Sequence, residues 1–376
     1  MTKSITAKTL YEAIQTLPGI TIVDVRPTRA YEKWKIEGKY VTSFNLQFLD
    51  LKQMGEKVQE VIPSDLPIVT VCEQGHLAVK AADVLASQGY EVTVLKGGME
   101  AWSSFYETRE IVSNEHLQLY QIIRPAKGCL SYIVISRDEA VIVDPSRHLE
   151  FYKQFVAEKG VTIRHIMDTH LHADHISGGY QLADETGADY WIAAEEMHSS
   201  VKPYQALPDR KELLFGDGKL HFMSYFTPGH TVASTSILID NQYLLSGDTI
   251  FVNGIGRPDL KGQATVMANK MFETIQRLNK DLSGECLILP GHYASQEEIN
   301  EQGFIGATYG DIQQCVHLLQ VNDRQVFVAE TLQNLGDTPP NFEKITKINQ
   351  GTVVVDAKEQ SILENGPNLC AVSNVG

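Results

Sequence analysis

The apolar positions of the first hundred residues alternate between two kinds of spacing. Leu10, Ile14 and Leu17 recur at helical spacing, whereas 21–25 (TIVDV) and 67–72 (PIVTVC) are short, continuous apolar runs. A short apolar run is typical of a buried strand, and strands that alternate with helices are typical of a parallel sheet. The pattern therefore predicts a small α/β domain.

After a polar stretch of about a dozen residues, the spacing of the apolar positions changes. Strand-like runs occupy 117–123, 129–135 and 139–145, and helical spacing returns around 175–187 and 264–279. Strand-rich runs interspersed with amphipathic helices indicate two packed sheets with helices outside them.

We place the boundary between these two patterns of apolar spacing, and so between two domains, near residue 112. The expected domains are therefore 1–112 and 113–376.

Composition indicates in which compartment the protein resides and which classes of partner it can bind. No apolar run is long enough to span a membrane, and the first residues are polar and then amphipathic, so we expect a cytoplasmic protein without a membrane partner. The formal charge of −15 lies almost entirely after residue 112 and would repel phosphate backbones, which argues against a nucleic-acid partner. Five widely scattered cysteines fit reduced thiols better than a disulfide framework.

The stretch THLHADHISGG, residues 169–179, concentrates metal-ligand side chains. It holds His170, His172, Asp174 and His175, and we expect it to be a strand-to-helix loop in which His175 begins the helix. Alternate side chains of an extended loop point the same way, and imidazoles with a carboxylate are typical ligands of a divalent first-row metal.

Three further ligand-type residues follow apolar runs on glycine-containing turns. They are His230 in TPGHT, Asp248 in SGDT and His292 in PGHY. Such turns suit a site assembled from loops at one edge of a sheet. A polar surface loop with neighbouring histidines is the simpler alternative, but it does not account for all seven residues.

The motifs HLHADH, TPGHT, SGDT and PGHY, in this order, resemble the metallo-β-lactamase fold superfamily over about residues 115–300. The resemblance implies an αβ/βα sandwich with metal at the edge where the loops meet. It does not fix the chemistry, because this fold serves thioester hydrolases, lactamases, nucleases and oxygenases.

The first domain carries a second resemblance. DVR (24–26), Cys72 directly after a strand, and GGMEAW (97–102) resemble a rhodanese, a sulfurtransferase, over roughly residues 5–108. Loop amides and a helix N-terminus are expected to face the sulfur of Cys72 and to stabilise a persulfide anion there. A buried, inert cysteine and a non-enzymatic sulfur carrier are the alternatives.

The loop after Cys72 departs from the rhodanese pattern. Glu73 is acidic, and only His76 supplies a positive charge within the loop, where the family has basic residues. Thiosulfate, a dianion, is therefore expected to bind poorly.

The resemblance of the second domain leaves two metal assignments. A dinuclear zinc thioester hydrolase similar to glyoxalase II would use all seven residues, with Asp248 bridging two metals. A persulfide dioxygenase would hold one Fe(II) with His170, His230 and Asp248. The residues that would then orient ligands are His172, Asp174, His175 and His292.

The neighbouring sulfur-transfer domain favours the dioxygenase. The expected reaction oxidises a low-molecular-weight thiol persulfide, of the glutathione, coenzyme A or bacillithiol type, with O2 to sulfite, as in sulfide detoxification. Sulfite could then meet a persulfide on Cys72 to yield thiosulfate, or Cys72 could deliver sulfane sulfur to the thiol.

Two residues are candidates for substrate binding. Arg257, in the loop 251–260, could hold a carboxylate or phosphate of the thiol carrier, or it could pair with Asp259 to stabilise the turn. Tyr293 could donate a hydrogen bond into the pocket. A homodimer is expected from the family resemblance alone.

Overall fold

The chain passes from a smaller structural unit to a larger one at Glu107. The computed structural model describes residues 3–259, 262–333, 335, 341–366, 368 and 370–373, side chains of 371–373 excepted. The smaller unit comprises 3–107, 124–127 and 365–366, and the other described residues form the larger unit. The boundary that the sequence predicts near residue 112 lies a few residues later than this division.

A five-stranded parallel sheet organises the smaller unit, in the order β1-β5-β4-β2-β3. Its strands are β1 (Lys3–Ile5), β2 (Ile20–Asp24), β3 (Val41–Asn45), β4 (Ile68–Val71) and β5 (Val92–Leu95). Its helices are α1 (Ala7–Ile14), α2 (Thr28–Lys33), α3 (Phe48–Met54), the 3-10 helix η1 (Gly55–Glu60), α4 (His76–Ser87) and α5 (Gly98–Ser103).

Helices cover both faces of this sheet. Side chains alternate along a strand, so Val23 packs in the cluster that includes α3 and α4, whereas Ile22 packs with residues of α1 and α5. The predicted α/β domain with a parallel sheet is confirmed.

Two sheets form the larger unit. The first has the order β12-β11-β10-β9-β8-β7-β6, with β9 to β12 parallel and β8 antiparallel to β9. Its strands are β6 (Glu107–Ser113), β7 (Gln118–Arg124), β8 (Cys129–Ser136), β9 (Glu139–Val143), β10 (Thr162–Met167), β11 (Asp189–Ile192) and β12 (Gln205–Ala206).

The second sheet has the order β13-β14-β15-β18-β19, in which β15 and β18 are parallel. Its strands are β13 (Phe222–Phe226), β14 (Thr235–Ile239), β15 (Tyr243–Gly247), β18 (Leu287–Pro290) and β19 (Ala307–Thr308). A smaller sheet joins β16 (Ile250–Phe251), β17 (Gly254–Gly256) and β20 (Ala371–Ser373).

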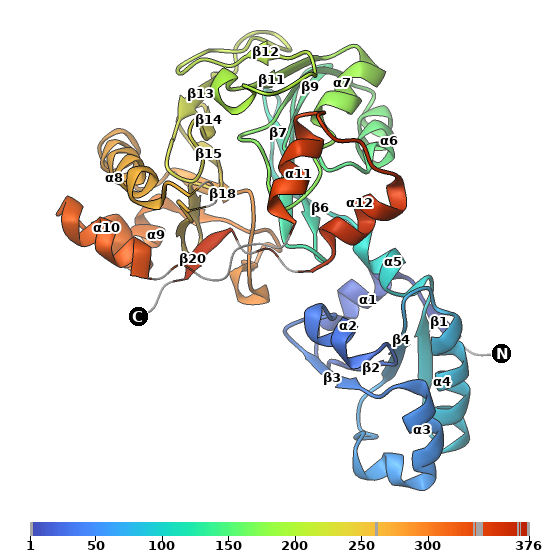
Figure 1. Ribbon diagram of the computed structural model, residues 1–376. Helices are drawn as coiled ribbons and strands as arrows, with labels where there is room; N and C mark the ends of the chain where they lie inside the picture. Colours follow the sequence, from blue (N-terminus) through green and yellow to red (C-terminus); the bar gives the residue numbers. More distant parts are fainter. Residues whose placement is uncertain are drawn as a thin grey trace. The chain divides into compact units, whose positions relative to one another are not determined.

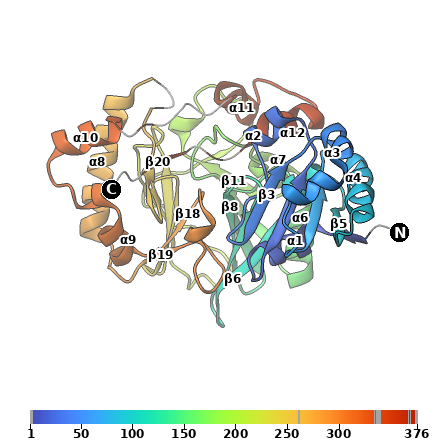
Figure 2. The same cartoon turned by 90° about the horizontal axis from the view of Figure 1, so that it is seen from below.

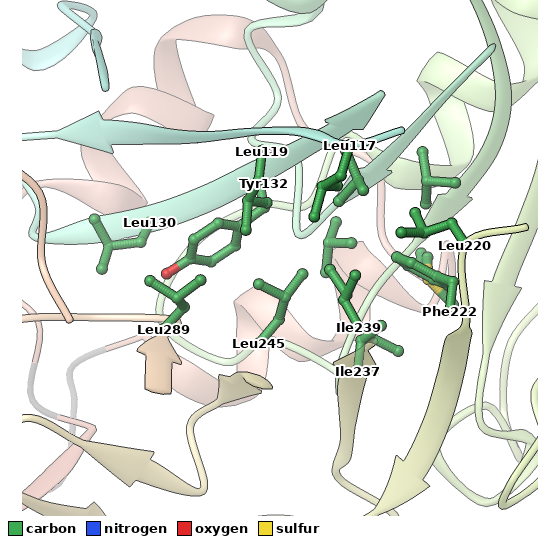
Figure 3. Packing of buried hydrophobic residues seen from close by; sticks show 14 of the residues in the cluster. Leu117, Leu119, Leu130, Tyr132, Leu220, Phe222, Ile237, Ile239, Leu245 and Leu289 are labelled. Atoms are coloured by element: carbon green, nitrogen blue, oxygen red, sulfur yellow. The ribbon is translucent and has the colours of Figure 1, made fainter. Parts of the chain in front are cut away.

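The main hydrophobic core lies between the two large sheets. Figure 3 shows Leu119 and Tyr132 of the first sheet near Ile237, Leu245 and Leu289 of the second. Burying such side chains is the dominant favourable term in folding, at roughly 1.5–3 kcal/mol for each. This core fixes the strand ends from which the site loops emerge.

Helices cover the outer faces of the sandwich. Because side chains alternate, Leu238, Leu244 and Ile288 leave the main core and pack in a second cluster against α8 and α10. Figures 1 and 2 show α8, α9 and α10 on this side, and α6 and α7 beside the first sheet. The helices are α6 (Leu149–Lys159), α7 (Gly179–Thr186), α8 (Ala264–Asp281), α9 (Tyr309–Cys315), α10 (Arg324–Gln333), α11 (Phe342–Asn349) and α12 (Ala357–Glu364), with 3-10 turns η2 (Ala194–Glu196), η3 (Gln296–Glu298) and η4 (His317–Gln320). The predicted αβ/βα sandwich is confirmed.

The helix predicted over 175–187 begins later than the sequence indicates. It starts at Gly179, and His175 lies in the preceding loop, so the expectation that His175 begins the helix was wrong. The reason is an isolated antiparallel bridge between Ser146 and Ser177, which keeps this part of the chain extended.

None of the helices in the described part of the chain combines the length and the apolar character needed to cross a membrane.

Candidate metal centre and sulfur site

The loop between β10 and α7 carries four buried ligand-type side chains, and distant parts of the chain hold its backbone. The side-chain amide of Asn349, at the end of α11, donates to the carbonyls of His172 and His175 at 2.9 Å each. Glu364 of α12 accepts from the amide of Ile176 at 2.8 Å. The C-terminal helices therefore fix the loop that carries the predicted ligands.

His170, His230 and Asp248 form one buried group of donor atoms. Asp248 Oδ2 lies 3.7 Å from His170 Nε2 and 3.5 Å from His230 Nε2. Among the described residues, Asp248 Oδ2 has no hydrogen-bond partner. An orphaned buried carboxylate oxygen between two imidazole nitrogens fits a divalent cation.

Hydrogen bonds on the far ring nitrogens orient these two histidines. His230 Nδ1 donates to the carbonyl of Arg257 at 2.9 Å. The Thr169 hydroxyl donates to Asp144 Oδ2 at 2.8 Å, so it accepts from His170 Nδ1 at 2.9 Å. Both Nε2 atoms are then left with the lone pair that a metal requires.

The protonation states suit the same role. Burial holds the pKa of His170 well below its ordinary value and lowers that of His230. Burial acts to raise the pKa of Asp248, but His292 and the other two histidines outweigh it and keep the carboxyl ionised. Neutral imidazoles and an ionised carboxylate are the forms that bind metals.

A second group of donors lies beside the first. Asp174 Oδ1 lies 3.1 Å from His175 Nδ1, and Asp174 Oδ2 lies 2.9 Å from His292 Nε2. Cys129, at the start of β8, joins this group with its Sγ 3.6 Å from Asp174 Oδ2. Cys129 was not predicted from the sequence, because no motif surrounds it.

One hydrogen bond connects the two groups. His292 Nδ1 donates to Asp248 Oδ1 at 2.7 Å, so the two oxygens of Asp248 serve different groups. A Cβ on Gly291 would lie 2.7 Å from Asp248 Oδ1, and only glycine leaves that carboxylate its place.

His172 faces a different set of partners. Its Nε2 lies 3.0 Å from Asp144 Oδ1 and 3.8 Å from Asp168 Oδ1. Asp144 also accepts from the Thr169 amide at 2.7 Å, and it adopts a φ of 53°. Asp144 directly follows a buried strand, and that position is the sequence signal by which Asp144 could have been predicted as a site residue.

A cavity of about 590 Å³ reaches the first group at His230. Leu171 and Met267 form part of the apolar lining of the cavity. Phe342 and Lys347 of α11 also line it. Lys347 was not predicted from the sequence, because its position depends on how α11 packs.

The two residues predicted to bind substrate lie elsewhere. Arg257 is buried and forms a bidentate pair with Asp259, at 2.7 and 2.8 Å, so the geometry favours the turn-stabilising alternative. Tyr293 is buried in the main core. Neither side chain lines the cavity at His230.

In the smaller unit, Cys72 follows β4 and precedes α4. Its Sγ accepts from the amide of Ala78, in the first turn of α4, at 3.3 Å, which confirms that a helix amide faces the sulfur. The amides of Met99 and Glu100 donate to the carbonyls of Cys72 and Glu73 at 2.9 and 3.0 Å. The GGMEAW motif thus holds the loop by its backbone.

A cation outside the loop also approaches it. Arg26 Nη1 lies 3.9 Å from the carboxylate of Glu73, although Arg26 is buried in a bidentate pair with Asp24. His76 is therefore not the sole positive group near this loop. Two carboxylates, those of Asp24 and Glu73, offset the charge of Arg26, so this cation adds no net positive charge beside Cys72.

Comparison with known proteins assigns both units. The metallo-beta-lactamase superfamily matches residues 124–301, and the rhodanese-like domain matches residues 6–105. The probable metallo-hydrolase YqgX of Bacillus subtilis is 30% identical over 191 residues, covering 46% of this chain and 88% of that protein. The mitochondrial persulfide dioxygenase ETHE1 of Homo sapiens is 27% identical over 187 residues, covering 48% and 70%. A crystal structure of a metallo-beta-lactamase from Staphylococcus aureus is 29% identical with a TM-score of 0.57, covering 62% and 72%.

Asp144→Asn tests the network behind the first group. The change removes the charge that orients Thr169 and His172, so metal affinity should fall by roughly 10- to 100-fold. Metal titration of the apo-protein measures this. Asp138→Asn, an exposed aspartate on the neighbouring turn, is the control and should leave affinity unchanged. Equal affinity in the Asp144 variant would show that this network does not support the site.

Proposed function

Because the chain belongs to the metallo-beta-lactamase superfamily and carries a rhodanese-like domain, we propose that it is a persulfide dioxygenase with a coupled sulfurtransferase site. The larger domain would oxidise a low-molecular-weight thiol persulfide at one Fe(II) held by His170, His230 and Asp248. The smaller domain would carry sulfane sulfur on Cys72.

The observation that carries the proposal is the group of two imidazole nitrogens and one carboxylate oxygen. Two histidines and one carboxylate are the facial triad of non-haem iron oxygenases, which leaves coordination positions open. A sulfur site in the same chain supports a sulfur substrate for that triad.

The overall reaction is RSSH + O2 + H2O → RSH + SO3²⁻ + 2 H⁺. The four electrons that reduce O2 come from the terminal sulfur, which leaves as sulfite while the thiol is regenerated. Iron(II) would supply the site at which O2 and the anionic persulfide meet.

The protein's own residues give this chemistry its geometry. The carbonyl of Arg257 and the hydroxyl of Thr169 hold the two imidazole rings, and His292 holds Asp248 through its second oxygen. The three donors therefore keep their orientation toward one another, and His230 is the one of the three that lines the cavity.

One cationic side chain of the cavity could bind an anionic thiol carrier. The apolar wall can pack on a thiol chain, and Lys347 of α11 offers a positive charge, one helical turn from Glu343, which also lines the cavity. Glutathione, coenzyme A and bacillithiol all carry carboxylates or phosphates that a lysine attracts.

Cys72 would exchange sulfane sulfur with the products. In one direction sulfite attacks the outer sulfur of a Cys72 persulfide, which gives thiosulfate and the Cys72 thiolate. In the other, a thiol attacks that sulfur and becomes the substrate of the metal site. The Ala78 amide is placed to stabilise the thiolate left in either direction.

A dinuclear zinc thioester hydrolase, with an accessory sulfur-carrier domain, is the second candidate. His172 Nδ1 is buried and has no hydrogen-bond partner among the described residues, so it remains available as a further ligand. That reading predicts two zinc ions and a bridging Asp248.

The first test is metal content. Protein purified without added metal should hold about one iron per chain, and His230→Ala should lose most of it because one of three ligands is gone. Elemental analysis and O2 uptake with a thiol persulfide measure this. His221→Ala, an exposed histidine, is the control. Two zinc ions, thioester hydrolysis and no O2 uptake would favour the hydrolase instead.

Cys72→Ser should separate the two domains. Sulfurtransfer should disappear, because a hydroxyl cannot carry sulfane sulfur, while persulfide-dependent O2 uptake persists and the products shift toward sulfite. Cys315→Ser, at an exposed thiol, should change neither activity. If O2 uptake with a free thiol persulfide stopped in the Cys72 variant, Cys72 would be an obligatory feeder of the metal site.

Lys347→Ala tests the carrier site. The persulfide KM should rise by roughly 2- to 5-fold with kcat unchanged, the size expected for an exposed charge pair. Lys344→Ala on the same helix is the control, because Lys344 pairs with Glu359 and does not line the cavity. An unchanged KM in the Lys347 variant would place the anionic end of the carrier elsewhere.

A further inference from the structure

Helix α11 contacts two parts of the site with different sides. The side chains of this helix that line the cavity at His230 recur at helical spacing, and they are Phe342, Glu343, Thr346 and Lys347. The buried side chains of the helix lie on the other side, and they are Ile345, Ile348 and Asn349. One side of α11 is therefore a wall of the cavity, and the other is packed inside the domain.

The buried side of α11 holds the backbone of the ligand loop through Asn349. The side-chain amide of Asn349 donates to the carbonyls of His172 and His175, at 2.9 Å each. Its side-chain oxygen accepts from the amide of Ser177 at 3.0 Å. One side chain thus makes three hydrogen bonds to the loop, and its rotation would break them together.

Ile176 joins the same loop to both C-terminal helices. Its side chain packs in one hydrophobic cluster with Ile345 and Ile348 of α11. Its amide donates to Glu364 of α12 at 2.8 Å, and Glu364 in turn pairs with Arg147 at 2.9 Å. The loop and α11 are therefore packed as one unit on this side.

The ligand loop also forms part of the cavity wall. Leu171 and Ala173 line the cavity, and they alternate along the chain with His170, His172 and Asp174. Alternate side chains of an extended segment point to opposite sides, so one side of the loop carries ligand-type residues and the other faces the cavity. A shift of this loop would therefore move metal donors and cavity wall together.

We propose that Asn349 is a positioning residue that couples metal binding to the order of the α11 wall of the cavity. A metal held by His170 would restrain the loop, and Asn349 would pass that restraint to α11 through the carbonyls of His172 and His175. The inference rests on the metal centre and the carrier cavity of the proposed function, but not on which reaction occurs there.

Coupling of this kind is reciprocal. If metal orders α11, then a ligand that packs on Phe342 and Lys347 raises the affinity for metal by the same factor. The two-state element that both sites bias is the packing of α11 on the ligand loop. A chain without metal would thus have a loosely held cavity wall, which disfavours binding of a carrier that it cannot process.

Amide hydrogen exchange with the metal alone tests the coupling. Exchange of α11 is compared in the apo-protein and after addition of iron(II) without oxygen, with zinc(II) in a parallel sample. We expect either metal to slow exchange in α11 by roughly 5- to 150-fold, the ordinary range of coupling. Helix α10, which packs in the second cluster, should change less and reports any stabilisation of the whole domain.

Asn349→Asp tests the residue itself. Aspartate keeps an acceptor for the Ser177 amide but has no donor for the two carbonyls, so saturating metal should still slow exchange in the loop but no longer in α11. Asn279→Asp is the matched control, because the half-buried Asn279 of α8 donates in the same way to the carbonyl of Leu319. A purely structural role would change apo and metal-loaded exchange equally, so the metal-dependent difference isolates positioning.

The outcomes separate this inference from the proposed reaction. Metal-dependent protection of α11 that is lost in Asn349→Asp supports the coupling. Unchanged exchange of α11 in the metal-loaded wild type, which needs no variant to fold, overturns it, as does full protection in the Asn349 variant. Persulfide-dependent O2 uptake without protection of α11 refutes this inference alone, whereas protection without persulfide oxidation refutes the proposed reaction alone. Failure of the wild type to take up either metal overturns both.

Discussion

The structure of the larger domain depends on how it neutralises buried charge. Asp248 is almost inaccessible, and its two oxygens face three imidazoles. A carboxylate taken out of water is costly unless hydrogen bonds or a cation compensate its charge. His292 donates to Asp248 Oδ1, whereas Asp248 Oδ2, which faces the neutral His170 and His230, has no hydrogen-bond partner among the described residues and is the oxygen that a cation would compensate.

The glycines and hydroxyls around the site follow from the same constraint. Gly291 leaves room for Asp248, and Thr169 passes a hydrogen bond from His170 to Asp144. An unpaired buried polar group costs about 1–3 kcal/mol, so the hydrogen bonds around the ligands leave unpaired chiefly atoms that a cation could bind, such as Asp248 Oδ2 and His172 Nδ1. The precision of the site thus comes from residues that would touch neither metal nor substrate.

The sequence predicted what is encoded in short motifs. The two domain types and the seven ligand-type positions could be read from local spacing, because each ligand sits beside its own strand and turn. Cys129 and Lys347 could not, because each reaches the site through packing with segments far away in the chain. Asp144 had one local signal, its position directly after a buried strand. The start of α7 was misplaced because it depends on the bridge between Ser146 and Ser177, which is a tertiary contact.

The hydrogen bonds from Asn349 to the carbonyls of His172 and His175 have a consequence for biosynthesis. The ligand loop leaves the ribosome long before α11 and α12, and domains generally fold from the N-terminus as they are made. The rhodanese-like domain can therefore mature early, while the loop that carries the ligand-type histidines waits until α11 and α12 have been synthesised. Metal insertion would then follow the synthesis of α11, and a nascent chain that stalls before α11 would carry a formed Cys72 loop together with an unfinished metal site.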